Sequence, residues 1–203
     1  MTQSKASKNI VTLLFGAILL TISFALSIFL FRVLLDRLLL FQYSDAFLSA
    51  SMRILLTLIL FQIFWGIYKK SLIKPVIWTT GLFYCLLLLY VVMVKIPGRT
   101  AVNLNPFALI NDLMTIPFYP ISNFLFFVPV GFFLGYVFRK KIPRMLFLAG
   151  FIVSVILELI QLIFQIGIFD VTDIILNGGG FAIGVWLFVL VCHSTKVREL
   201  LYT

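Results

Sequence analysis

The sequence predicts an all-α integral membrane protein, a bundle of about six transmembrane helices with both ends of the chain in the cytoplasm. Hydrophobic residues make up 63% of the chain and charged residues only 11%, whereas soluble domains average roughly 45–50% and 25%. Such a chain must expose apolar surface, which needs lipid as its solvent. In lipid, backbone polar groups must be paired internally, so only helices and closed barrels are possible. The apolar runs here are continuous rather than alternating, which favours helices.

Six apolar stretches have the length of a membrane span, which is about 20 residues. The expected spans are 10–31, 47–68, 76–94, 121–138, 145–166 and 173–192. The first stretch exceeds the apolar core of a signal peptide, about 7–15 residues, so we expect it to be retained as a helix. The expected organisation is two N-terminal helices in residues 1–75, a four-helix membrane domain in 76–193 and a short cytoplasmic tail in 194–203.

The basic residues orient the bundle. If the N-terminus is cytoplasmic, most of the 16 Lys and Arg residues face the cytoplasm, namely Lys5, Lys8, Lys69, Lys70, Lys74, Arg139, Lys140, Lys141, Arg144, Lys196 and Arg198. This bias follows the positive-inside rule and predicts both termini inside. Although the formal net charge is +9, the basic residues cluster at helix ends, so we expect membrane lipid and not nucleic acid as the partner.

The longest connection, residues 95–120, is expected on the outer side and is rich in Pro, Gly and Asn. Long loops in compact chains are often functional. Residues 103–107 predict a turn that re-enters the membrane interface, with Asn103 and Asn105 as candidate polar groups. Arg99 is the candidate basic partner for a carboxylate there.

Polar residues line one face of the fifth span. Ser154, Glu158, Gln161 and Gln165 have offsets of 0, 4, 7 and 11, which places them on one helical stripe. An ionisable residue inside a span costs about 2.5–3.5 kcal/mol on insertion scales, so the stripe must face other helices or water. The Ser and Gln side chains are explained as interhelical hydrogen-bonding groups. Glu158 is the candidate functional residue, and the candidate general acid or base if there is catalysis.

The sixth span repeats these offsets with Asp173, Asn177, Gly180 and Gly184. Small residues four apart allow close helix approach, and the fourth span carries a second such pair, Gly131 and Gly135. For Asp170 and Asp173 the alternative to a binding role is capping of the sixth helix.

The polar groups are expected to converge at the outer side, since Glu158 would lie about 12 Å from the outer end of its span. The expected outward-facing cavity contains Arg99, Asn103, Asn105, Asn123, Ser154, Glu158, Gln161, Asp170, Asp173 and Asn177. We expect neither a metal site nor a cofactor, because no His or Cys accompanies the carboxylates. Cys85 and Cys192 lie within spans as small apolar residues, and His193 lies at a helix end.

Four short motifs in this order resemble the VanZ-like family over residues 82–186. They are Asn103-Leu104-x-Pro106-Phe107, Asn123-x-x-x-Phe127-x-Pro129-x-Gly131, Ser154-x-x-x-Glu158-Leu159-x-Gln161 and Phe169-Asp170-x-x-Asp173-Ile174-Ile175-Leu176-Asn177-x-x-Gly180-x-x-x-Gly184. Many members carry an Arg where this chain has Ile168, so no role for that Arg is transferred. The resemblance implies a bacterial plasma-membrane protein of the cell envelope, and the family's founding member lowers susceptibility to the glycopeptide antibiotic teicoplanin.

Three functions are compatible with these residues. The first is a non-enzymatic envelope protein that binds a lipid-linked wall precursor or a glycopeptide in the outward polar cavity. The second is an intramembrane enzyme that acts on a lipid-linked substrate, although the sequence contains no recognisable nucleophile–base pair. The third is a small transporter, which the apolar, glycine-lined inner halves of the spans disfavour. The sequence carries no signal for the oligomeric state.

Overall fold

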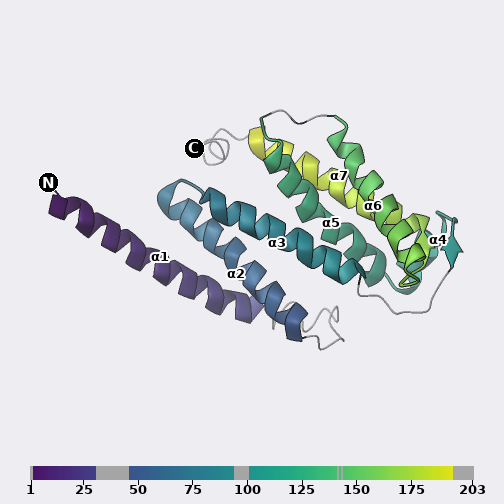
Figure 1. Ribbon diagram of the computed structural model, residues 1–203, viewed down its shortest axis with the longest axis horizontal. Coiled ribbons are helices and arrows are strands. Elements are labelled where there is room, and N and C mark those ends of the chain that lie inside the picture. Colours follow the sequence, from purple (N-terminus) through teal and green to yellow (C-terminus); the bar gives the residue numbers. More distant parts are fainter. Residues whose placement is uncertain (1, 31–45, 94–100, 141, 143, 194–203) are drawn as a thin grey trace. The chain divides into compact units, whose positions relative to one another are not determined.

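A computed structural model describes residues 2–30, 46–93, 101–140, 142 and 144–193, with side chains from residue 9 onward. Its helices are α1 (Thr2–Leu30), α2 (Ala46–Lys69), α3 (Lys74–Met93), α4 (Ala108–Thr115), α5 (Phe118–Val137), α6 (Leu146–Ile163) and α7 (Val171–His193) (Figure 1). Within these described ranges, every helix except α4 is long and apolar enough to cross a membrane, six in all. The predicted all-α membrane bundle is therefore confirmed.

The chain divides into two compact units, and the division lies between Phe83 and Tyr84, inside α3. The boundary predicted from the sequence, at residue 75, would lie at the start of this helix. The second half of α3 belongs to the core of the second unit. There the Tyr84 hydroxyl donates a hydrogen bond of 2.8 Å to the carbonyl of Phe126 in α5, and Leu88 joins the buried apolar cluster.

Polar side chains connect the helices of the first unit. The hydroxyls of Ser27 in α1 and Thr57 in α2 lie 2.8 Å apart in a buried hydrogen bond. The Gln62 side chain closes the turn between α2 and α3, since its amide donates to the carbonyl of Ile73 (2.8 Å) and accepts from the N–H of Ile73 (3.2 Å). These groups act as interhelical hydrogen-bonding groups, as polar residues in spans commonly do.

In the second unit, α7 packs along both α5 and α6. Its contact with α5 brings backbone against backbone. A Cβ added at Gly131 of α5 would overlap the carbonyl oxygen of Phe181, and one at Gly184 of α7 would overlap that of Val128. Gly180 approaches the α5 backbone equally closely. Only glycine allows this separation, because the overlapping atoms are main-chain atoms that cannot rotate away.

Phenylalanine side chains cover other glycines of the second unit. Where α6 meets α7, the Phe181 ring of α7 lies over Gly150, and the Phe151 ring of α6 lies over Gly178. Gly135 of α5 contacts the Phe188 side chain in the same manner, so that a Cβ added at Gly135 would lie 2.8 Å from the Cβ of Phe188. Packing of phenylalanine over glycine fills the space that a side chain would occupy and so holds the helices at short range.

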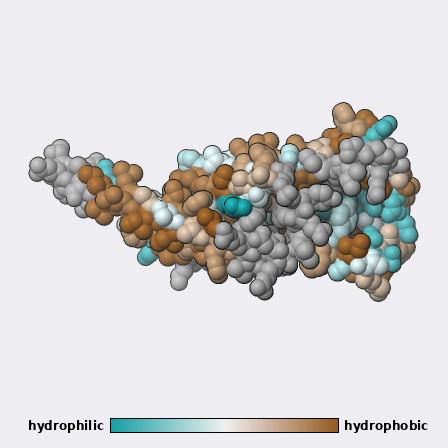
Figure 2. All heavy atoms as spheres, turned by 90° about the horizontal axis from the view of Figure 1, so that it is seen from below, coloured by the Kyte–Doolittle hydropathy of each residue, from teal (hydrophilic) through white to brown (hydrophobic). Residues whose placement is uncertain are grey.

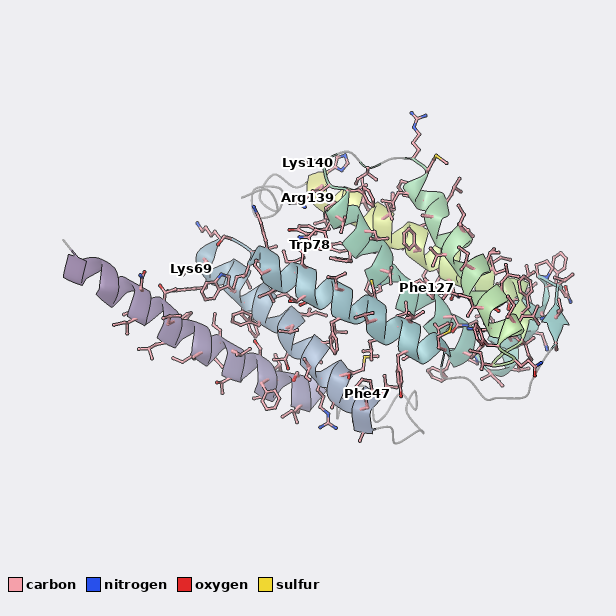
Figure 3. The ribbon with its side chains drawn as sticks, in the orientation of Figure 1. Phe47, Lys69, Trp78, Phe127, Arg139 and Lys140 are labelled. Atoms are coloured by element: carbon pink, nitrogen blue, oxygen red, sulfur yellow. The ribbon has the colours of Figure 1, made fainter. Side chains whose placement is uncertain are left out.

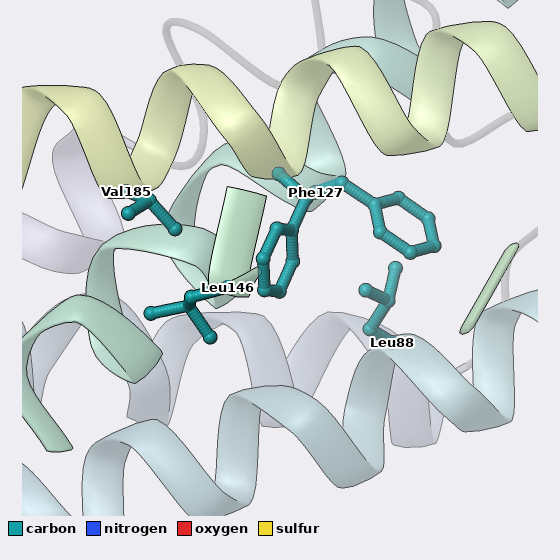
Figure 4. Close-up of a cluster of buried hydrophobic side chains, with 5 residues drawn as sticks. Leu88, Phe127, Leu146 and Val185 are labelled. Atoms are coloured by element: carbon teal, nitrogen blue, oxygen red, sulfur yellow. The ribbon is translucent and has the colours of Figure 1, made fainter. Parts of the chain in front are cut away.

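The buried apolar core of the second unit joins four helices. Figure 4 shows its members, which are Leu88, Phe127, Leu146, Phe181 and Val185. They come from α3, α5, α6 and α7. A core of this composition fixes how these helices pack but offers no polar group for chemistry.

The end of α6 differs from the prediction. The helix ends at Ile163, and Gln165 has a φ of 55°, so Gln165 lies beyond the helix and not on the polar stripe. The N–H of Ile166 donates to the carbonyl of Gln161 (3.0 Å), and that of Gln165 donates to Leu162 (3.2 Å). These two bonds form a Schellman motif, which stops the helix with a left-handed residue. The apolar pattern continues through this turn, which is why the sequence predicts a longer helix.

Two short strands add a parallel pairing at the end of the second unit. Val102 of β1 (Val102–Asn103) pairs with Phe169 of β2 (Phe169–Asp170), and Asn103 pairs with Asp170. After β1, the Asn103 side chain accepts from the N–H of Asn105, and the Asn105 side chain accepts from the N–H of Phe107, each at 3.1 Å. These Asx turns lead into α4. Residues 101–120 are therefore an ordered sequence of strand, turns and helix.

The two ends of the second unit differ in character. In Figure 2 most coloured atoms are hydrophobic, and hydrophilic atoms are most numerous at the end that carries β1, β2 and α4. At the other end of α5 lie Arg139 and Lys140 (Figure 3), with the Arg139 guanidinium 4.4 Å from the centre of the Tyr136 ring. Cationic and aromatic residues of this kind are typical of a membrane–water boundary.

A labelling experiment tests the predicted orientation. In a chain without native cysteines, Cys introduced by Asn111→Cys in α4 should react with a membrane-impermeant thiol reagent added to intact cells. Cys introduced by Lys140→Cys, beyond the other end of α5, should react only after permeabilisation. Both native residues are exposed, so access to the reagent depends on the side of the membrane. The reverse pattern would show that the positive-inside assignment is wrong.

Candidate functional site

Polar side chains from α5, α6, α7 and the strands meet at the α4-bearing end of the second unit. We call this group the carboxylate cluster: the acids Glu158, Asp170 and Asp173 with their donors Asn103, Tyr119 and Asn123. The sequence had singled out every member except Tyr119. Direct hydrogen bonds join these residues in two groups, one around Asp170 and one around Asp173.

Glu158 connects α6 to the segment that begins α7. Its side chain is only 1% exposed, and its Oε2 atom accepts a hydrogen bond of 3.1 Å from the N–H of Asp170. Because α6 ends at Ile163, Glu158 lies about 7.5 Å along the helix from that end, less than the 12 Å predicted. An acid in this position is held inside the protein, yet close to the boundary of its span.

Asp170, one of the two acids with capping as an alternative role, caps α7. Its Oδ1 atom accepts from the N–H of Thr172 at 2.8 Å, in the first turn of α7. Its Oδ2 atom accepts from the Asn103 side chain at 3.1 Å. The first bond is an N-cap interaction, and the second reinforces the pairing of β1 with β2. Asp170 therefore fixes the loop geometry at this end of the bundle.

Asp173 instead binds α5. It lies in the first turn of α7 and is 2% exposed. Its Oδ1 atom accepts from the Asn123 side chain at 2.7 Å, and its Oδ2 atom accepts from the Tyr119 hydroxyl at 3.0 Å. Asp170 lies three residues before Asp173 at the start of α7, which places the two parts of the cluster at the same end of this helix.

Tyr119 was missed because the predicted fourth span began at residue 121, whereas α5 begins at Phe118. The signal was nevertheless present. Tyr119 precedes Asn123 by four residues, so the two side chains share one face of a helix. Extending the helix by one turn would have placed this hydroxyl beside the polar stripe.

A second polar pair lies one helical turn deeper. The Asn177 side chain, four residues after Asp173, donates a hydrogen bond of 3.2 Å to the hydroxyl of Ser154, four residues before Glu158. Both residues are buried. The Asn177 side-chain oxygen accepts no hydrogen bond from any residue in the described ranges. This pair joins α6 to α7 beneath the cluster.

Other predicted site residues lie elsewhere or have local roles. Gln161 is fully buried and donates to the carbonyl of Val92 in α3 at 3.1 Å. Asn105 is exposed and caps the turn before α4. Arg99 lies outside the described residues. His193 bonds the carbonyl of Val189 in its own helix (2.8 Å). Cys85 and Cys192 are half-buried and form no disulfide within the described ranges.

The chemistry of the cluster is that of carboxylates held by amide and hydroxyl donors. Amides and hydroxyls fix the orientation of a carboxylate without neutralising its charge. No three His, Cys, Asp or Glu side chains form a metal-binding group among the residues that the structure describes. The arrangement can accept hydrogen bonds from a ligand, attract a cationic group or exchange a proton.

Comparison with known proteins assigns the family. The VanZ/LLP1 family model matches residues 81–192, which is more than half of the chain. The chain belongs to the VanZ/LLP1 family. The resemblance drawn from the four motifs is thus confirmed, and the entire carboxylate cluster lies within the segment that matches the VanZ/LLP1 model.

One similar curated protein is protein VanZ of Enterococcus faecium, with 32% identity over 94 residues. The aligned segment covers 45% of this chain and 55% of that protein, so the chain matches about half the length of its VanZ/LLP1 relative. No solved structure shows significant similarity to the chain.

Proposed function

We propose that this protein is a cell-envelope protein of the bacterial plasma membrane that binds a lipid-linked wall precursor at its carboxylate cluster. Binding on the extracytoplasmic side would change what a glycopeptide antibiotic such as teicoplanin encounters at the cell surface. Membership of the VanZ/LLP1 family supports the setting. The gathering of buried carboxylates with amide and hydroxyl donors at the α4-bearing end of the second unit supports the location of the site.

Glu158 is the observation that carries this proposal. A glutamine at this position could accept the same hydrogen bond from the N–H of Asp170 without introducing a charge. A charged residue inside a span costs about 2.5–3.5 kcal/mol on insertion scales for Asp, Lys and Arg. An ionisable residue inside a span is a candidate functional group for this reason. The Glu158 carboxyl offers a charge or an exchangeable proton that a polar head group could use.

Exposure indicates how a ligand would approach. Glu158 and Asp173 are almost fully buried, whereas Asn105 is exposed and Tyr119 is 49% exposed. In our proposal the polar head group of the ligand first contacts the exposed residues Asn105 and Tyr119. The buried carboxylates then act on it directly or through the Tyr119 hydroxyl, which already bonds Asp173.

The contacts support binding over catalysis or transport. Ser154, the hydroxyl one turn from Glu158, is hydrogen-bonded to the Asn177 amide and not to a base. A transport path would have to continue beyond the Ser154–Asn177 pair. In the described part of the second unit, the buried residues beyond Asn177 on α7 are glycines and apolar residues, namely Gly178, Gly180, Phe181, Gly184, Val185 and Phe188.

Drug susceptibility tests the proposal. The parent chain, expressed in a teicoplanin-sensitive bacterium, should lower susceptibility, and Glu158→Gln should abolish this effect at equal membrane abundance. Asp112→Asn is the matched control: it removes a carboxylate from α4, outside the cluster, and should keep the effect. A fully active Gln variant would show that the Glu158 charge has no functional role. A parent without any effect on susceptibility would contradict the link to teicoplanin.

A further inference from the structure

The exposed face of α4 is apolar. Phe107, which precedes the helix, and Ile110, Leu113 and Met114 within it are spaced along one helical stripe. Phe107 is 73% exposed and Met114 is 80% exposed. A helix at a protein–water boundary turns such a stripe toward the core and exposes its polar side. In α4 the apolar stripe is itself exposed, so this stripe requires an apolar environment outside the bundle.

The other side of α4 is occupied. Ala108, Leu109 and Asp112 are half-buried, and α4 packs against α5. With eight residues, α4 is about 12 Å long, whereas the hydrocarbon core of a bilayer is about 30 Å thick. Helices this short are marginal in water. α4 therefore cannot cross a membrane, and its stripe faces away from the bundle.

The surface of α5 next to α4 indicates what covers the stripe. Phe118, Tyr119 and Ile121, in the first turn of this span, are each about half-exposed, at 52%, 49% and 45%. Lipid covers the exposed apolar side chains of a membrane span, and aromatic residues collect at the depth of the head groups. The α4 stripe continues this lipid-covered surface beyond the end of the span.

We propose that α4 is an interfacial membrane anchor. It lies in the plane of the bilayer with its stripe (Phe107, Ile110, Leu113 and Met114) inserted among the phospholipids of the adjacent leaflet. The polar residues Asn111 and Thr115, both exposed, face away from the acyl chains. Because the Asx turns connect β1 directly to α4, the anchor holds Asn103 at head-group depth. If the proposed function is correct, the ligand therefore meets the cluster at the membrane surface.

Environment-sensitive labels test the anchor. In a Cys85→Ala and Cys192→Ala background, the variants Met114→Cys, Ile110→Cys and Thr115→Cys are each labelled with the fluorophore NBD. The purified proteins are placed in vesicles of phosphatidylethanolamine and phosphatidylglycerol, with and without doxyl-labelled phosphatidylcholine. Labels on the stripe should emit at shorter wavelength and be quenched several-fold more by the doxyl lipid than the label at Thr115. Aqueous iodide should quench them in the opposite order.

Two results would overturn the anchor. If iodide quenches the stripe labels as strongly as the Thr115 label, the stripe faces water. If neither iodide nor doxyl lipid reaches them, a protein surface or a second copy of the chain covers the stripe. Both stripe positions are largely exposed, so the label displaces no packed neighbour. A size-exclusion profile equal to that of the parent verifies each variant. The readout does not depend on drug susceptibility, so the anchor and the proposed function can fail separately.

Discussion

Gly184→Leu should yield no folded protein from detergent extracts, and Gly184→Ala should be strongly destabilised. A Cβ at this position would overlap the carbonyl oxygen of Val128 and would lie 2.8 Å from the backbone nitrogen of Phe132. Both neighbours are main-chain atoms of α5, so no side-chain rotation can make room and the helices must separate. Overpacking typically costs about 1–3 kcal/mol even where side chains can adjust.

Gly179→Ala is the matched control for Gly184, in the same helix. Its added Cβ would meet only the ring of Phe124, at 3.6 Å, which is ordinary van der Waals contact. Because alanine favours a helix over glycine by about 1 kcal/mol, this variant should be as stable as the parent or more stable. Thermal unfolding followed by fluorescence-detected size exclusion compares the variants. Equal melting temperatures for Gly184→Ala and the parent would disprove the backbone contact between α5 and α7.

Asp173→Leu should be the most damaging change in the carboxylate cluster. It removes the buried acceptor of two hydrogen bonds and leaves the donors of half-buried Asn123 and half-exposed Tyr119 without this partner. An unsatisfied buried donor costs about 1–3 kcal/mol, although hydrogen bonds inside membranes average nearer 0.6 kcal/mol because alternative partners exist. Removal of the buried charge offsets part of the loss. We expect a net destabilisation of about 2 kcal/mol.

A multiple variant separates these contributions. Asp173→Leu combined with Asn123→Leu and Tyr119→Phe removes the donors together with their acceptor. Replacing a whole buried polar group with apolar residues is often neutral or stabilising, so the triple variant should regain most of the lost stability. The melting temperatures of the single variants, of Asp173→Leu combined with either donor substitution, and of the triple variant measure the coupling between Asp173 and its two donors. If the donor substitutions only add to the loss, the hydrogen bonds to Asp173 are not what connects α7 to α5.

The membrane spans were predictable from the sequence because their determinants are local. A continuous apolar run of sufficient length has only one stable form in lipid, a helix that pairs its own backbone. The polar offsets in α6 follow from helical periodicity alone, and Ser154, Glu158 and Gln161 are all buried in the structure. Periodicity could not locate the helix ends, where capping competes with the pattern. Gln165, in a left-handed conformation beyond α6, shows this limit.

The partner of each polar side chain was decided only by the tertiary structure. Asn103 and Asp170 are 67 residues apart in sequence, and their hydrogen bond requires β1 to lie beside β2. The same holds for Gly150 and Phe181, whose contact depends on how α6 lies against α7. Hydrophobicity and helical spacing act over one or two turns of chain, whereas these contacts depend on the path of the loops. For this protein, the amino-acid sequence alone therefore determined the spans, the buried faces and the family, and helix packing decided which residues form the cluster.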